Sequence, residues 1–233
     1  MALPQLNSAR YETNIPSLGQ SITYRPYLVK EEKVLMLALE SQDQKMIMRA
    51  IKDVIEQCVY DDINVNKLAV FDIESLFLAL RSKSVGENID LKMKCNECES
   101  MSNVSINLED IQAPEMSDNN QIMLTDTVGV VLNYPSFENI QKMGDDLESV
   151  EGAFKMLVSC IDTIFDEDNV HDASNETQKN LNEFLENLNS EQFQKLTAFF
   201  ETMPALTHNV SYACKSCGHN NEIELKGLQS FFT

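Results

Sequence analysis

The sequence predicts an α+β protein, because two kinds of segment alternate along it. Short strand-like runs end in turn residues, and longer stretches carry apolar residues three and four positions apart, as helices do. Two of the strand-like hairpins also carry a Cys-x-x-Cys motif. We therefore expect an N-terminal β-hairpin, a helical hairpin and helical bundle, and a small antiparallel β ribbon formed by two CxxC knuckles distant in sequence.

The N-terminal region is predicted to be a hairpin followed by helices. Strand-like runs at Tyr11–Ile15 and Ser21–Tyr24 flank the turn residues between them. Apolar residues at helical spacing predict one helix around 34–39 and a second around 47–55. A third helix is expected from Asp72, as its N-cap, to about Ser82.

Two cysteine pairs carry the clearest chemistry. Cys95 and Cys98 follow the strand-like run 89–93, and Cys214 and Cys217 follow the run 208–213. Two thiolates two residues apart bind one soft divalent metal, and two such pairs complete the closed tetrahedron of sulfurs found in structural zinc sites. The pattern predicts a zinc ribbon with one structural zinc ion, and the alternatives are a redox dithiol pair or unligated thiols.

The residue after each pair distinguishes the two knuckles. Gly218 follows Cys217 and favours the left-handed backbone conformation in which N–H groups point at the sulfurs. Glu99 follows Cys98, so the first knuckle places a carboxylate where the second has a glycine.

Between the cysteine pairs the sequence predicts strands and then helices. Strand-like runs follow the first pair at 104–108, 121–125 and 128–134, helices are expected at 137–143, 150–165, 177–188 and 192–200, and the last strand is expected at 221–226. The acidic run 166–172 lacks the glycine and terminal glutamate of an EF-hand, so a solvated connector is favoured over a calcium site. We divide the chain into an N-terminal hairpin and helical region (1–86), a β-rich zinc-ribbon region (87–135 and 205–233) and an inserted helical region (136–204).

Charge and composition exclude several classes of function. The net charge is −19, with 37 acidic against 18 basic side chains, which argues against nucleic-acid binding because phosphate recognition needs a basic surface. No apolar run is long enough to cross a membrane, and the N-terminus lacks a signal-peptide pattern, so we expect a cytoplasmic protein. Its cysteines would be reduced, and Cys58 and Cys160 are expected to be small buried apolar residues.

Catalysis finds little support in the sequence. There is no nucleophile-elbow motif and no phosphate-binding glycine loop, and the histidines are scattered. Four thiolates would fill a zinc ion and leave no position for a reacting water. We therefore expect neither enzymatic activity nor a small-molecule substrate.

Several segments resemble a known family. The stretches 24–33, 71–74 and 76–87, together with 2–4, 124–126 and 133–135, are similar to the baseplate hub assembly family of T-even-type contractile-tailed bacteriophages. The resemblance implies a role in building the central hub of the tail baseplate, through contacts with other hub and tail proteins. It implies a place in the host cytoplasm during assembly and, for a retained component, in the virion tail baseplate. Members include hub subunits and hub assembly catalysts, where "catalyst" means an aid to assembly.

Aromatic residues near the ends of the chain are candidates for partner binding. In an interaction protein, the binding energy would come from a few buried aromatic or aliphatic residues. Our candidates are Tyr24, Tyr27, Phe231 and Phe232. The sequence thus predicts a non-enzymatic hub protein stabilised by structural zinc, and the alternative is a zinc-ribbon nucleic-acid-binding or regulatory factor.

Overall fold

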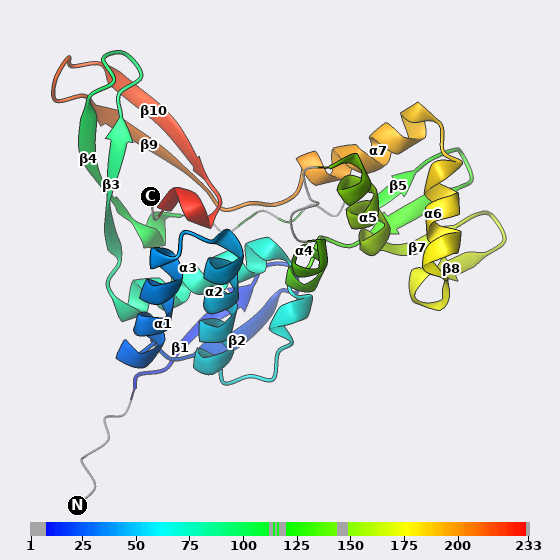
Figure 1. Cartoon of the computed structure of the whole chain (residues 1–233), viewed down its shortest axis with the longest axis horizontal. Coiled ribbons are helices and arrows are strands. Elements are labelled where there is room, and N and C mark those ends of the chain that lie inside the picture. The colour runs from blue at the N-terminus through cyan, green and yellow to red at the C-terminus, as the bar shows by residue number, and fades with distance from the viewer. Residues whose placement is uncertain (1–7, 112–113, 115, 117–119, 144–148, 232–233) are drawn as a thin grey trace, which may run out of the picture. The chain divides into compact units, whose positions relative to one another are not determined.

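The computed structural model describes residues 8–111, 114, 116, 120–143 and 149–231 of the chain. It confirms the mixed α+β composition. The chain divides into two compact units, of which unit 1 comprises residues 1–115 and 205–233 and unit 2 comprises residues 116–204 (Figure 1). The segment 116–135, which we grouped with the ribbon, thus lies within unit 2. The division into three regions otherwise stays a prediction.

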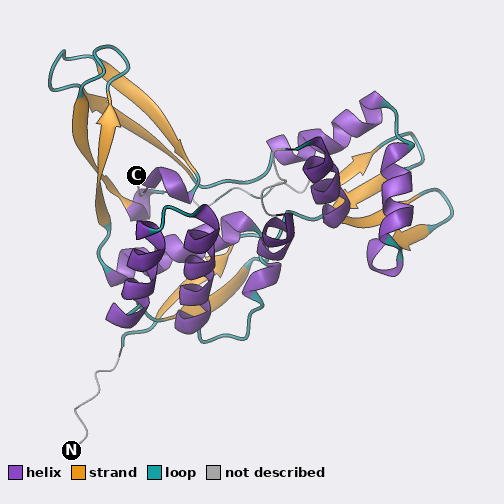
Figure 2. Ribbon diagram, viewed as in Figure 1, coloured by secondary structure: helices purple, strands orange, loops and turns teal. Residues whose placement is uncertain are grey.

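The first half of unit 1 combines a β-hairpin with three helices. Strands β1 (Tyr11–Ile15) and β2 (Gln20–Tyr24) pair antiparallel, as the turn residues between them predict. Helices α1 (Val29–Glu40) and α2 (Gln44–Cys58) form the expected helical hairpin, and α2 and β1 both pack on α3 (Val70–Ser84) (Figure 2). A short 3-10 helix, η1, covers Val65–Lys67. The fully buried side chains of this layer include Ile15, Ile22, Ile55, Ile73, Leu76 and Leu80.

The start of α3 differs from the expectation in an informative way. Its N-cap is Ala69, and Asp72 is the third residue of the helix. The Asp72 carboxylate is fully buried and accepts hydrogen bonds from the backbone N–H of Ala69 (3.1 Å), the backbone N–H of Ser17 (2.8 Å) and the Ser17 hydroxyl (2.6 Å). The predicted cap is therefore wrong by three residues, because Asp72 also binds the turn of the β1–β2 hairpin, a partner distant in sequence.

Two further hairpins complete unit 1, and both carry a cysteine pair. Strand β3 (Asn88–Lys94) pairs with β4 (Met101–Asn107), and β9 (Thr207–Ala213) pairs with β10 (Asn220–Lys226). The hairpins lie side by side with their turns at the same end (Figure 2). Alternate side chains are buried between them, among them Ile89, Leu91, Met93, Ile106, Val210 and Leu225.

Short 3-10 helices follow two of these strands. After β4 the chain forms η2 (Leu108–Asp110), and after β10 it forms η5 (Leu228–Phe231). The carboxylate of Glu74 in α3 accepts the backbone N–H of Leu228 at 3.0 Å. This bond fastens the C-terminal segment to the helical layer.

Unit 2 is a four-stranded antiparallel sheet covered by helices. The sheet has the order β5-β6-β7-β8, with β5 at Gln121–Met123, β6 at Gly129–Leu132, β7 at Ile161–Phe165 and β8 at Val170–Asp172. The helices are α4 (Phe137–Met143), α5 (Val150–Cys160), α6 (Gln178–Glu186) and α7 (Ser190–Glu201), with a 3-10 turn, η4, at Ala173–Asn175. The core between sheet and helices includes Val130, Leu132, Leu157, Ile161, Leu181, Leu185, Leu196 and Phe199.

The helix expected at 150–165 is too long. Helix α5 ends at Cys160, and the next five residues form β7, which pairs with β6. The β-branched residues Ile161, Thr163 and Ile164 suit a strand, and β6 supplies the pairing edge that sequence periodicity cannot reveal. Of the acidic run 166–172, expected as a connector, only residues 166–169 turn between β7 and β8, because residues 170–172 form β8 and pair with β7. In this turn Asp166 accepts the backbone N–H groups of Asp168 and Asn169 at 2.8 and 2.7 Å.

Candidate metal centre

The four motif cysteines meet at the tips of the two hairpins. Their sulfur atoms all lie within 4.8 Å of one another. Cys95 Sγ lies 3.7 Å from Cys217 Sγ, and Cys98 Sγ lies 3.6 Å from Cys214 Sγ. A disulfide requires about 2.05 Å, whereas a zinc ion with bonds of about 2.3 Å holds tetrahedral sulfurs about 3.8 Å apart. The spacing fits four ligands of one tetrahedral metal ion.

The two knuckles share one backbone geometry. The N–H of Glu99 donates to the carbonyl of Cys95 at 3.0 Å, and the N–H of Gly218 donates to the carbonyl of Cys214 at 2.9 Å. Glu99 and Gly218 have φ angles of 59° and 75°. The left-handed position expected at Gly218 is present, and Glu99 adopts the same conformation although its Cβ disfavours it.

Hydrogen bonds from a serine and from the backbone stabilise a thiolate at Cys214. Ser100 Oγ lies 3.0 Å from Cys98 Sγ and 3.2 Å from Cys214 Sγ, and the N–H of Ser216 lies 3.4 Å from Cys214 Sγ. The Ser100 hydroxyl and the backbone N–H groups of Cys217 and Ser216 lower the pKa of Cys214 to about 5. A thiolate is the form that binds metal.

Hydrogen bonding to neighbouring sulfurs keeps a different cysteine, Cys217, protonated. The backbone N–H of His219 lowers the pKa of Cys217, but the nearby sulfurs of Cys98, Cys214 and Cys95, together with burial, raise it to about 12. Four anionic sulfurs at this spacing require a compensating cation, and a bound divalent metal deprotonates its thiol ligands. The donor set therefore suits a soft divalent ion such as zinc.

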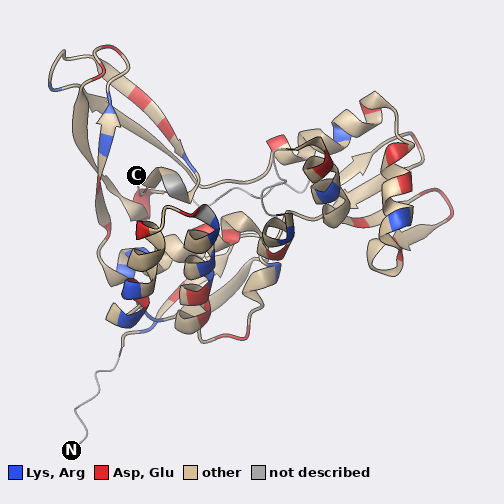
Figure 3. Cartoon of the chain, in the orientation of Figure 1, with Lys and Arg blue, Asp and Glu red and all other residues tan. Residues whose placement is uncertain are grey.

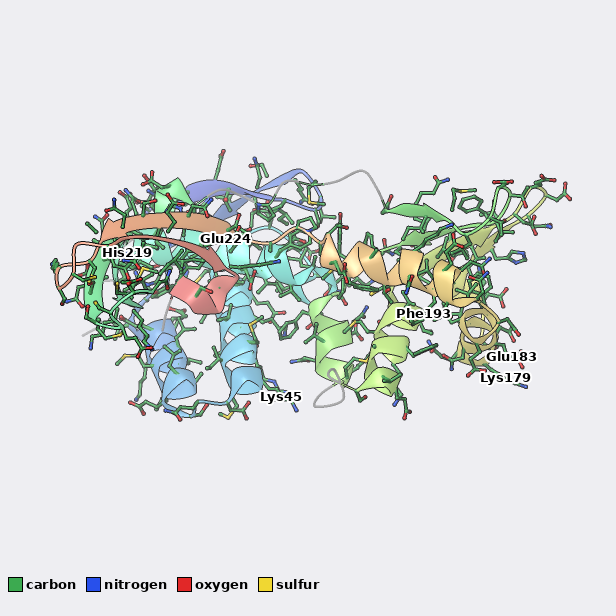
Figure 4. The ribbon with its side chains drawn as sticks, turned by 90° about the horizontal axis from the view of Figure 1, so that it is seen from above. Lys45, Lys179, Glu183, Phe193, His219 and Glu224 are labelled. Atoms are coloured by element: carbon green, nitrogen blue, oxygen red, sulfur yellow. The ribbon has the colours of Figure 1, made fainter. Side chains whose placement is uncertain are left out.

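The side chain of Asn221 forms hydrogen bonds to the cysteine cluster and to the backbone next to it. It lies on β10, is only 1% exposed, and its Oδ1 accepts the backbone N–H of Asn96 at 2.9 Å. Its Nδ2 lies 3.6 Å from Cys95 Sγ and 3.2 Å from the carbonyl oxygen of His219, which is at the hairpin tip in Figure 4. Sequence reasoning missed both Asn221 and Ser100. The available signal for Asn221 was a polar residue at an inward position of an alternating strand.

The aromatic candidates for partner binding lie in the interior of unit 1. Tyr24, Tyr27 and Phe231 are 3%, 8% and 1% exposed. The Tyr24 hydroxyl donates to the carbonyl of Ala79 at 3.3 Å. Phe232 lies outside the described residues. The structure thus gives these three rings internal packing contacts, so a partner surface has to be sought elsewhere.

The two remaining cysteines are buried within the separate units. Cys58 ends α2 and Cys160 ends α5, and both are at most 1% exposed. Burial raises the pKa of each thiol to about 11. Both positions agree with the expectation of small buried apolar residues, distinct from the four-cysteine cluster.

The fold and this cluster define a class: a mixed α+β protein whose closed set of four sulfur donors has the geometry of a structural cross-link rather than of an open reactive site. The family follows from comparison with family models, where the model described as T4 bacteriophage base plate protein matches residues 8–233. The chain belongs to this family and is a structural protein of the phage tail baseplate.

No curated protein and no solved structure matches the chain. No helix in the described parts of the chain is long and apolar enough to span a bilayer.

Proposed function

We propose that this protein takes part in assembling the central hub of the baseplate through protein–protein contacts, without enzymatic activity. The observation that carries the proposal is the family match, which runs through both units and both cysteine hairpins. The resemblance of segments 24–33 and 76–87 to hub assembly proteins supports the hub in particular. Its partners would be other hub and tail proteins, met in the host cytoplasm during assembly.

Within this role, Cys95, Cys98, Cys214 and Cys217 bind one structural zinc ion. The support is the sulfur spacing and the hydrogen bonds of Ser100 and Asn221 to the cluster. Zinc in such sites contributes apparent free energies of about 10 kcal/mol at neutral pH. The ion would cross-link the β3–β4 hairpin to the β9–β10 hairpin. Because unit 2 lies between these hairpins in the sequence, the cross-link would also hold together the two ends of the segment that contains it.

The hub role is tested by following the chain through assembly. Quantitative mass spectrometry compares mature particles with baseplate-hub intermediates from infected cells. A fixed ratio to hub proteins in both samples indicates a retained component, and presence only in intermediates indicates a transient assembly factor. Absence from both samples would contradict the proposal.

The zinc claim is tested by metal analysis of purified protein. We expect about one zinc per chain, and Cys214→Ala should lose it and lower the unfolding midpoint sharply. Cys58→Ala is the matched control, since it removes a buried thiol of unit 1 that lies outside the cluster. Unchanged zinc content in Cys214→Ala would reject the shared site while leaving the hub role open.

A zinc-ribbon nucleic-acid factor is the alternative, and the charge distribution disfavours it. Acidic positions outnumber basic ones in both units (Figure 3). Unit 2 holds 17 Asp and Glu against 4 Lys and no Arg, a net charge of −13. Fluorescence anisotropy with labelled DNA and RNA should show no binding at physiological salt. Binding with a steep salt dependence would favour the alternative.

A further inference from the structure

Helix α1 exposes much of its apolar surface. Its buried residues are only Glu31, Leu35 and Ala38. Val29 is 79% exposed, Met36 56% and Leu37 57%, and Val34 and Leu39 are also about half exposed. Contiguous exposed apolar surface is typical of interaction sites, whereas single exposed apolar residues are common on any protein.

The outward face of α1 also carries two charges placed symmetrically about its apolar centre. Lys33, Met36, Leu37 and Glu40 are all exposed, and their spacing of three, four and seven positions places them on one side of the helix. Lys33 precedes the Met36–Leu37 midpoint by as many positions as Glu40 follows it. Neither charged side chain forms an ion pair within the described chain.

We propose that the outward face of α1 binds the same face of a second copy of this chain, in an antiparallel two-fold contact. Met36 and Leu37 would pack against their counterparts at the two-fold axis. Lys33 of each copy would lie opposite Glu40 of the other, so one contact contains two equivalent ion pairs. A two-fold contact requires such self-complementarity of a single surface patch.

The local charge balance favours a second copy as the occupant. Two molecules of net charge −19 repel each other over most of their surface. The α1–α2 hairpin is an exception, since residues 29–58 hold 6 acidic and 5 basic side chains. Burial of the apolar side chains would supply the association free energy, and the paired charges would fix direction and register. This inference is independent of the hub role.

Sedimentation velocity over a concentration series tests the contact on the full chain. We expect the wild type to shift from monomer to dimer with rising concentration. Leu37→Ser should remain monomeric, because it removes a central apolar contact. Its thermal unfolding midpoint should stay close to that of the wild type, since Leu37 is 57% exposed in the single chain.

Charge reversal tests the antiparallel register. Lys33→Glu and Glu40→Lys should each weaken dimerisation about tenfold, because either change places two like-charge pairs across the contact. The double variant should recover most of the wild-type affinity, since both pairs are again of opposite charge. Lys179→Glu and Glu183→Lys, one helical turn apart on exposed positions of α6 in unit 2, change the net charge equally and should have little effect (Figure 4).

Three results would each contradict a different part of the proposal. A wild type that stays monomeric up to its solubility limit overturns self-association and leaves the face to another protein. A dimer that persists in Leu37→Ser overturns the role of α1. Failure of the double variant to recover affinity overturns the antiparallel register.

Discussion

Asn221 and Asn96 join the two cysteine hairpins directly, since the Asn221 side chain accepts the backbone N–H of Asn96 at 2.9 Å. The residues are 125 positions apart in sequence. The same amide group donates toward Cys95 Sγ, so one buried side chain contacts both the backbone and a sulfur of the opposite knuckle. The arrangement orients the first knuckle relative to the second, as residues behind metal ligands commonly do.

Replacing Asn221 by alanine should therefore destabilise unit 1. The change removes the part-buried hydrogen bond to the N–H of Asn96 and the one directed at Cys95 Sγ, which should cost about 1 kcal/mol. Urea unfolding of the metal-loaded protein measures the loss. Asn220→Ala, at the exposed neighbouring position of β10, serves as the control and should have little effect. Equal stability of the two variants would show that Asn221 does not support the cluster.

Glu99→Gly should stabilise the protein by up to about 1 kcal/mol, because glycine tolerates a left-handed backbone that a Cβ disfavours. Glu99 has φ of 59°. Its ion pair with Lys94 at 3.1 Å is solvent-exposed and contributes little. Lys94→Ala, which removes only that pair, is the matched control.

The reverse change at the second knuckle completes this comparison. Gly218→Ala should lower stability by about 1 kcal/mol. No atom lies within 4 Å of the added Cβ, so only the φ of 75° opposes the substitution. Thermal unfolding of Glu99→Gly and Gly218→Ala measures both effects. A Gly218→Ala variant more stable than the wild type would contradict the claim that a Cβ is unfavourable at this positive φ.

Glu74 should make stability fall as pH rises above the acidic range. Burial raises the pKa of its carboxyl above the ordinary value of 4.5, while the N–H of Leu228 partly offsets that shift. Because the pKa of Glu74 is higher in the folded than in the unfolded chain, its protonation adds to the free energy of unfolding. This stabilising contribution is complete below the unfolded pKa and is lost as pH rises through the folded pKa. Glu74→Gln retains an oxygen acceptor for Leu228 without the buried charge. It should exceed the wild type in stability at pH 7 and match it near pH 4.

Denaturant unfolding across this pH range measures that difference. Glu224→Gln removes a carboxylate from an exposed position of β10 and should show no comparable gain (Figure 4). A Glu74→Gln variant less stable than the wild type at pH 7 would mean that the ionised carboxylate strengthens its bond to Leu228 enough to outweigh its desolvation.

Metal removal should affect the two units unequally. Chelation removes the link between the cysteine hairpins, so hydrogen exchange should accelerate first in β3, β4, β9 and β10. The core of unit 2, which includes Leu157 and Leu196, has no cysteine of the cluster and should keep its protection. Exchange mass spectrometry with and without chelator resolves the two regions. A uniform loss of protection would show that unit 2 depends on the metal for its own stability.

The cysteine hairpins could be predicted closely because their signals are local. Alternating strands and the CxxC motifs placed the arms within one to three residues of β3, β4, β9 and β10. The meeting of the two pairs followed from the ligand count of a tetrahedral metal. The contributions of Ser100 and Asn221 could not be predicted, since they depend on which side chains the facing hairpin brings to each sulfur.

Elements that depend on tertiary partners were harder to predict. Ile161 continues an apolar pattern that suits either helix or strand, and only its pairing with Leu132 decides for the strand. Tyr24 was predicted to bind a partner, but its side chain is buried and its hydroxyl donates to a carbonyl of α3. Leu37 lies in an apolar stretch typical of a core helix, and the structure leaves it exposed. In each case the sequence indicates an apolar residue but not whether another surface of the chain covers it.

The position of the cysteine cluster has a consequence for the length of the segment between its two pairs. A metal ion bound by residues 95–98 and 214–217, as proposed above, would turn the chain between them into a loop with fixed ends. The entropy of closing such a loop grows only with the logarithm of its length, so doubling it costs about 0.6 kcal/mol. With the metal bound, a change in the length of the segment that contains unit 2 should therefore cost unit 1 little loop-closure free energy.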